Sequence, residues 1–225
     1  LVLPGQEAVV ASREGDGLQL TETAQLVNVT ELKLTEPVIN TLVINSSFEE
    51  GHSLRPNRWG VYSEITGWTA DLDFNDAPIE VQRGTVTEAS DGEHYIELDS
   101  HPRKPFSESN AAVYQDIPTE DGQAYRLSFD YAVERSPRGI NEGNYQDSNT
   151  VEVYWEGERV AVLNEFRQEW TTTEVLVVGN SGGASRLEFR GGGREDTHGG
   201  FIDNVKLEQV GVSSGGPGGG PLNPD

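Results

Sequence analysis

The chain has 225 residues, with 16 Lys and Arg against 38 Asp and Glu, and therefore a formal net charge of −22 at pH 7. Such an acidic surface repels phosphate backbones and attracts cations, so we expect no nucleic-acid partner, although solubility or a saline habitat would explain the charge equally well. The absence of Cys excludes disulfides and thiolate sites, and no apolar run approaches the roughly 18 to 20 residues of a membrane helix, so we expect no membrane span.

Residues 1–40 contain no Trp, Tyr or Phe. Without aromatic anchors this segment is poorly suited to forming a core of its own. Its short apolar pieces can instead provide one or two strands, either to the domain that follows or to another copy of the chain. We therefore predict an N-terminal extension, strand-forming or donor segment over residues 1–40.

Residues 41–210 contain a succession of short, strand-like segments. The clearest is 125–133, where apolar and polar residues alternate as in a half-buried strand. Further strands are predicted at residues 38–44, 79–82, 94–98, 112–117, 151–155, 159–163, 170–178, 186–190 and 201–209. Short strands at regular spacing, without an amphipathic helix, predict an all-β domain, an antiparallel β-sandwich of jelly-roll type.

Residues 211–225 are rich in Gly, Pro and Ser and poor in apolar residues. This composition is typical of a flexible linker or a disordered tail. A linker implies further sequence beyond it, so we expect the chain to be one module of a longer protein.

One acid stands out in the last predicted strand, Gly199–Glu208. With the period-two alternation of a strand, the Asp203 side chain lies on an apolar face. That face carries Phe201, Val205 and Leu207. Because an unpaired buried charge costs several kcal/mol, we expect Asp203 to lie at the sheet margin, to accept several hydrogen bonds, or to bind a cation.

A second acid, Glu49, directly follows the apolar segment that begins at Leu42. If the first and last strands of the domain are neighbours, Glu49 and Asp203 can hold one metal ion. The alternative is that Asp203 caps turn amides while Glu49 is solvated.

Eight segments in order indicate a family resemblance: NSSFEEG (45–51), ITGWTA (65–70), IEVQ (79–82), ASDGEHYIELDS (89–100), VYQDIPTEDGQAYRLSFDYA (113–132), SNTVEVYWEGERV (148–160), RLEFRGGG (186–193) and GGFIDNVKL (199–207). In this succession the chain resembles the galactose-binding-like sandwich modules of large secreted bacterial proteins, including calcium-dependent adhesins. It is similar, more distantly, to carbohydrate-binding modules. The resemblance implies the same sandwich fold, but sugar binding, peptide binding and purely structural roles all occur on it.

The resemblance also implies a structural calcium ion. It would join the acid after the first strand, the turn before a middle strand and the Asp of the last strand, which are Glu49, Asp91 and Asp203 in this sequence. Carboxylate oxygens are the ligands that calcium prefers.

A second acidic stretch contains Asp71, Asp73 and Asp76. It resembles the start of a calcium loop, but it lacks the Gly and the Glu that an EF-hand requires. The stretch is therefore either a second calcium site or a solvated acidic loop.

Aromatic residues in polar stretches provide candidates for sugar stacking, because flat ring faces bind the C–H face of pyranoses. We predict Trp59, Tyr62 and Tyr145 as ligand-binding residues. Trp155, on the same face as Val151 and Val153, is expected in the core instead.

No catalytic motif is present: the sequence has no HExxH and no Gly-x-Ser-x-Gly. We therefore expect a non-catalytic, calcium-stabilised module, secreted or on the cell surface, that binds a glycan or cell-surface polysaccharide. The alternative is a structural subunit of an extracellular filament, sheath or surface layer, in which residues 1–40 donate a strand to the next copy.

Overall fold

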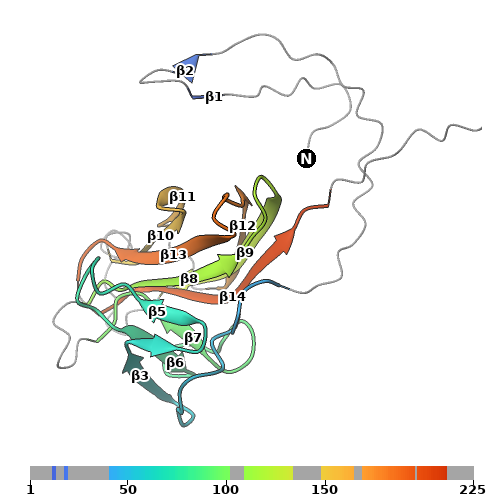
Figure 1. Ribbon diagram of the computed structural model, residues 1–225. Coiled ribbons are helices and arrows are strands. Elements are labelled where there is room, and N and C mark those ends of the chain that lie inside the picture. Colours follow the sequence, from blue (N-terminus) through green and yellow to red (C-terminus); the bar gives the residue numbers. More distant parts are fainter. Residues whose placement is uncertain are drawn as a thin grey trace, which may run out of the picture. The chain divides into compact units, whose positions relative to one another are not determined.

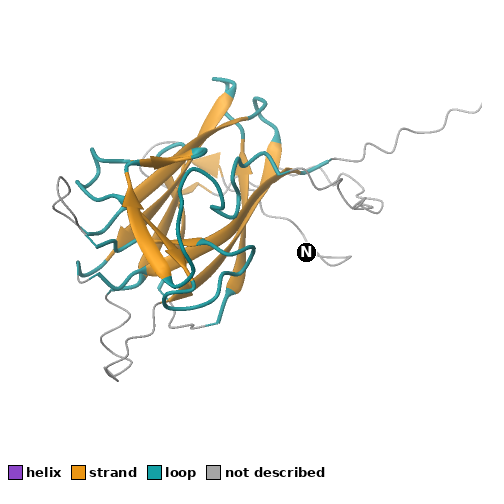
Figure 2. Cartoon of the chain, turned by 90° about the horizontal axis from the view of Figure 1, so that it is seen from below, coloured by secondary structure: helices purple, strands orange, loops and turns teal. Residues whose placement is uncertain are grey.

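Figures 1 and 2 show a computed structural model of the chain, which describes residues 41–101, 109–133, 148–164, 169–195 and 197–211, with Ser12–Arg13 and Leu18–Gln19. The chain divides into two units, residues 36–211 and residues 1–35 with 212–225. In the second of these units, β1 (Ser12–Arg13) and β2 (Leu18–Gln19) pair antiparallel. The remainder of the predicted donor segment, residue Tyr145 and residues 212–225 of the predicted linker lie outside the described residues.

Residues 36–211 contain two six-stranded antiparallel sheets (Figure 1). Sheet I has the order β12-β9-β14-β7-β6-β3 and sheet II the order β11-β10-β13-β8-β5-β4. The strands of sheet I are β3 (Arg58–Tyr62), β6 (Ile79–Arg83), β7 (Tyr95–Glu97), β9 (Ala124–Val133), β12 (Thr171–Val178) and β14 (Gly200–Gln209). Those of sheet II are β4 (Glu64–Ile65), β5 (Trp68–Ala70), β8 (Ala112–Pro118), β10 (Thr150–Trp155), β11 (Glu158–Leu163) and β13 (Ala184–Gly192).

The prediction of an all-β antiparallel sandwich of jelly-roll type is confirmed, since the described part of the chain consists of strands, turns and loops, as the colours of Figure 2 show. Among these residues, no helix has the length and apolar character to span a membrane.

The core forms between the two sheets, where apolar residues alternate inward along each strand. Phe129 of β9 meets Phe189 of β13 edge to face, with ring centroids 5.1 Å apart. Trp155 belongs to this core, as predicted, with 6% of its surface exposed. Its indole N–H donates to the Val178 carbonyl at 2.8 Å, so the one polar atom of the ring is satisfied.

The predicted first strand is wrong over its described residues, because residues 41–44 form bends and turns. Backbone φ is positive at Asn45 (53°) and Phe48 (57°), which ends any extended conformation there. The Gln115 side chain takes the place of a neighbouring strand: Ile44 N–H donates to Gln115 Oε1 at 2.8 Å, and Gln115 Nε2 donates to the Ile44 carbonyl at 3.0 Å. The segment nevertheless lies beside the last strand, since Leu42 N–H donates to the Leu207 carbonyl at 3.0 Å.

Replacing Gln115 by Leu is expected to lower the free energy of unfolding by about 1–3 kcal/mol, because both backbone groups of Ile44 lose their partner. Urea unfolding measures the loss, and hydrogen exchange should become faster at the Ile44 amide. Gln115→Glu keeps the acceptor and loses the donor, so its free energy of unfolding should lie between those of the wild type and of Gln115→Leu. A Leu variant as stable as the wild type would contradict this role of Gln115.

Strand β14 does not alternate as predicted, because it contains a β-bulge. Asp203 pairs with Asp130 and Lys206 with Ser128, so β14 has one residue more than β9 in this interval. Asn204 accommodates the extra residue with φ of 52°. Consequently Val205 and Leu207 enter the main core, whereas Phe201 packs in a separate cluster with Tyr95 and Ala132. The prediction that Phe201, Asp203, Val205 and Leu207 share one face is therefore wrong.

Candidate functional site

Asp203 is completely buried and fastens the 90–94 turn to β14. Its Oδ2 accepts the N–H groups of Ser90 at 2.7 Å and Asp91 at 2.9 Å, and its Oδ1 accepts the N–H of Asn204 at 2.7 Å. Burial raises the pKa of Asp203 to about 7, although these three amides act in the opposite direction.

Glu49 holds the other end of the same turn. Its Oε1 accepts the N–H groups of Glu93 at 2.6 Å and His94 at 2.8 Å, and its Oε2 lies 2.6 Å from Nδ1 of His94. A side chain at Gly92, where φ is +69°, would overlap the Glu49 carboxylate. Of the predicted residues, Glu49 and Asp203 thus accept amides at the two ends of one turn, and Asp91 lies within that turn.

Negative charge accumulates beside this turn. Asp130 is the cross-strand partner of Asp203, and its carboxylate accepts hydrogen bonds from the hydroxyls of Ser90 and Thr172. Ser47 Oγ donates to Asp91 at 2.5 Å. No ion pair between described residues includes Asp91, Asp130 or Asp203. In the described part of the chain, no three His, Asp or Glu side chains are arranged to hold a metal ion.

The second acidic stretch forms a turn. Asp71 Oδ1 accepts the N–H groups of Asp73 at 3.1 Å and Phe74 at 3.3 Å, which is the usual role of Asp at the start of a turn. Asn75 fastens the turn by donating to the Asn110 carbonyl at 3.0 Å. Asp73 and Asp76 are exposed.

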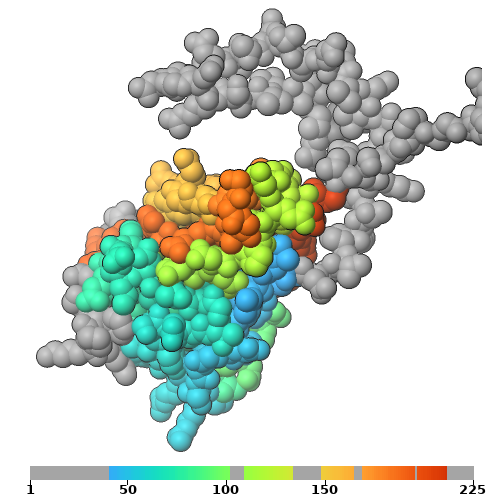
Figure 3. Space-filling view, in the orientation of Figure 1, coloured from blue at the N-terminus to red at the C-terminus, as the bar shows by residue number. Residues whose placement is uncertain are grey.

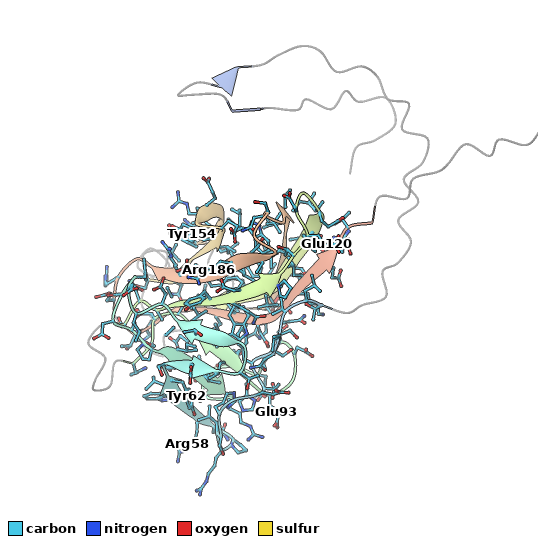
Figure 4. The ribbon with its side chains drawn as sticks, viewed as in Figure 1. Arg58, Tyr62, Glu93, Glu120, Tyr154 and Arg186 are labelled. Atoms are coloured by element: carbon cyan, nitrogen blue, oxygen red, sulfur yellow. The ribbon has the colours of Figure 1, made fainter. Side chains whose placement is uncertain are left out.

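The described aromatic candidates lie on β3, in sheet I. Trp59 is half-buried and stacks on His101, with ring centroids 4.7 Å apart. Tyr62 is also half-buried and packs against the main core. Figure 4 shows Tyr62 and Arg58 at the opposite end of the domain from Tyr154 and Arg186.

The outer face of sheet II carries a row of polar and aromatic side chains that the sequence analysis did not identify. Cross-strand pairing aligns Tyr114 of β8, Glu188 of β13 and Tyr154 of β10. Two strand spacings of about 4.8 Å separate the backbones of the two tyrosines by about 10 Å. The row continues to Thr69 on β5 and Arg159 on β11. We call these five residues the tyrosine row.

Arginines from β13 lie against the aromatic rings of this face. The Arg186 guanidinium carbon lies 3.9 Å from the Tyr114 ring centroid. That of Arg190 lies 4.0 Å from the Tyr154 centroid and 4.8 Å from that of Phe74, whose side chain is 41% exposed. Figure 3 shows residues from about 150 to 190, in yellow and orange, on the surface of the domain, and the Arg186 and Arg190 side chains are 44% and 25% exposed. Cation–π contacts therefore fix the guanidinium groups at an accessible surface.

Carboxylates hold the same arginines. Asp116 accepts from Arg186 Nε at 2.7 Å and Nη2 at 2.9 Å, and the guanidinium keeps the pKa of Asp116 below its usual range. Glu188 accepts from Arg190 Nε at 2.8 Å and Nη2 at 2.9 Å. Such bidentate contacts fix the orientation of each guanidinium group and neutralise its charge.

A third pair lies next to Tyr154. The Glu152 carboxylate accepts from the Tyr154 hydroxyl at 2.6 Å and from Arg159 Nη1 at 2.7 Å. These two hydrogen bonds lower the pKa of Glu152, and the first of them raises the pKa of Tyr154. Both tyrosines stand at the polar positions of alternating strands, and that signal in the sequence could have identified them.

No protein family model matches the chain. Two curated proteins are similar in sequence, both with the name multifunctional-autoprocessing repeats-in-toxin. The one from Vibrio cholerae is 25% identical over 191 residues, which cover 84% of this chain and 4% of that protein. The one from Vibrio vulnificus is 27% identical over 165 residues, which cover 73% of this chain and 3% of that protein. The chain thus spans a small fraction of the relatives that it matches.

Among solved structures, the Stig cyclase Fisc from Fischerella sp. TAU aligns with a TM-score of 0.52 and 15% identity, over 76% of this chain and 97% of the cyclase. A second cyclase from the same source gives a TM-score of 0.51 and 16% identity, over 74% and 95% of the two chains. The chain therefore shares its β-sandwich fold with these cyclases. The CBM22-1 xylan-binding domain of Paenibacillus barcinonensis Xyn10C aligns over 73% of this chain and 92% of that domain, at 12% identity and a TM-score of 0.40.

Proposed function

We propose that the chain is a non-catalytic carbohydrate-binding module, and that its ligand lies across the tyrosine row of sheet II. The observation that carries the proposal is the row itself, in which two half-buried tyrosines flank Glu188 on the outer face of sheet II. The arginines beside the row reach solvent, since the Arg186 and Arg159 side chains are 44% and 53% exposed. A guanidinium lies over each ring, and the rest of the ring offers apolar surface to the C–H groups of a sugar. The charged groups beside the rings offer donors and acceptors to its hydroxyls. The ligand face of this proposal thus differs from the predicted residues Trp59, Tyr62 and Tyr145.

The module would act as part of a larger secreted or cell-surface protein, as an adhesion or substrate-targeting module of galactose-binding-like type. The sequence similarity to a short part of two much longer toxins supports a modular origin.

Calcium is proposed as the stabilising ion at the 90–94 turn, with Glu49, Asp91 and Asp203 as its candidate ligands. The accumulation of carboxylates there, without an ion pair to Asp91 or Asp203 among described residues, supports this site. The ion would have to share the carboxylate oxygens with the turn amides that they already accept. The stretch Asp71, Asp73 and Asp76 is the weaker candidate, because Asp71 Oδ1 is engaged by two amides of its own turn.

Replacing Tyr154 by Ala is expected to weaken glycan binding by about tenfold or more, because the ligand loses one of the two ring surfaces. A glycan array followed by calorimetry with the tightest ligand measures the change. Tyr154→Phe keeps the ring and should retain most of the affinity. Leu176→Ala on β12 of sheet I, where the side chain is 72% exposed, serves as the control. Binding that survives Tyr154→Ala, or no binding across the array, would refute the proposal.

A further inference from the structure

We infer that the tyrosine row and the arginines stacked beside it select uncharged polysaccharides over polyanionic ones. This inference rests on the proposed function of the same face. Asp116 and Glu188 determine this preference, because they neutralise the arginines of the face.

Positive and negative charges balance on this face of sheet II. The pairs Arg186–Asp116, Arg190–Glu188 and Arg159–Glu152 each join one cation to one anion, at 2.7 Å, 2.8 Å and 2.7 Å. An anionic sugar that approaches Arg186 or Arg190 therefore meets a guanidinium that is already neutralised. It also comes close to the carboxylate that neutralises it, and like charges at such a distance repel.

The paired side chains keep hydrogen-bond donors and acceptors that the pairs themselves do not use. A guanidinium has five N–H groups. In Arg186 and Arg190 the carboxylate engages Nε and Nη2, which leaves both N–H groups of Nη1 outside the pair. The carboxylate oxygens keep further lone pairs. A hydroxyl group both donates and accepts, so a neutral polyhydroxyl chain can use both halves of the Arg186–Asp116 and Arg159–Glu152 pairs, which are partly exposed. The Glu188 carboxylate is buried, so the third pair offers Arg190 alone.

The guanidinium groups of Arg186 and Arg190 are already ordered before a ligand binds. The aromatic rings of Tyr114 and Tyr154 hold the two guanidinium groups at 3.9 Å and 4.0 Å, and the carboxylates fix their rotation. Ordering a free Arg on binding costs conformational entropy, and this cost is largely removed in advance. The net charge of −22 on the whole chain acts in the same direction, because it repels polyanions at a distance.

Binding of the intact chain to neutral polysaccharides (β-glucan, mannan and galactan) and to polygalacturonate and alginate tests the inference. We expect measurable affinity for at least one neutral polymer and at least tenfold weaker binding of both polyanions. Affinity for the neutral polymer should change little between low and high salt, because few ions are exchanged. Tighter binding of a polyanion overturns this inference but leaves the proposed function in place. No binding to either class overturns both.

A charge-exchange variant provides the second arm. Asp116→Asn with Glu188→Gln exposes the charge of both arginines, so binding to polygalacturonate should increase about tenfold or more and should weaken with salt. Glu50→Gln with Glu174→Gln changes the net charge by the same two units at exposed positions outside sheet II. An equal gain in this control overturns the inference. If the buried Glu188 change prevents folding, Asp116→Asn alone, at a side chain that is 51% exposed, still has to show a gain in polyanion binding.

Discussion

Replacing Asp203 by Ala is expected to lower the free energy of unfolding by about 2–4 kcal/mol. The substitution removes the acceptor of three backbone N–H groups, from Ser90, Asp91 and Asn204. It also detaches the 90–94 turn from β14. Asp203→Asn should cost less, because its one oxygen can still accept from Ser90 and Asp91, while its NH2 group faces the N–H of Asn204.

Urea unfolding at one pH measures both changes, and hydrogen exchange at Ser90 and Asp91 should report the freed turn. Glu50→Ala, at the exposed acid that follows Glu49 in the sequence, is the matched control and should shift stability by less than about 0.5 kcal/mol. An Asp203→Ala variant within that range would show that the turn is held by other contacts.

The second large effect concerns pH and calcium. The pKa of Asp203 rises from 3.8 to about 7 on folding, because burial disfavours the charged form. Between these values the folded protein retains a proton that the unfolded chain has released. Stability without metal is therefore expected to fall as the pH rises from about 4 to about 7, by up to ~4 kcal/mol from this group, and to show no further change from it above that range.

Calcium binding to the ionised carboxylate would reverse this trend, since an ion that binds the folded state stabilises it. Chelator should then lower the melting temperature strongly at pH 8 and hardly at pH 5. In Asp203→Asn, the loss of stability that Asp203 causes between pH 4 and 7 should disappear, together with most of the chelator effect. Melting curves that are identical with and without chelator at pH 8 would end the calcium proposal.

The β-sandwich fold could be predicted because its strands and turns follow from local sequence patterns. Alternation in β9 and the turn in the β10–β11 hairpin depend on neighbouring residues alone: Glu156 and Gly157 have φ of 53° and 78°, as a two-residue hairpin turn requires. The faces of β14 could not be predicted in this way, because one extra residue reverses the alternation after Asp203. The Asp203-Asn204 pair was the available signal, since Asn tolerates a positive φ better than most residues.

The strand predicted for residues 38–44 was wrong over its described residues for a related reason. Its apolar, β-branched residues fit a strand, but the partner of Ile44 is a side chain 71 residues away, Gln115. Local propensity contains no information about such a contact.

The site was predictable only in part. Glu49, Asp91 and Asp203 were predicted to meet, and they do contact one turn, but their bonds to amides depend on the fold of residues 90–94. The tyrosine row assembles residues from β8, β10 and β13 through the strand register. Strand order and register are set by the packed sheets, so sequence spacing does not reveal which outward residues become neighbours.

The bulge in β14 also determines which kinds of change the last strand can accept. Because β14 has one extra residue at Asn204, the side chains that follow it point to the other face of the sheet than regular alternation would give. The number of residues in this part of the strand therefore decides which side chains are buried. Substituting Asn204 by Gly or Asp would preserve the count and hence the burial of Val205 and Leu207. Deleting it would turn every following side chain to the other face of sheet I. Sequences that fold this way should therefore keep the number of residues constant here and favour Asn, Asp or Gly at this position, where φ is positive.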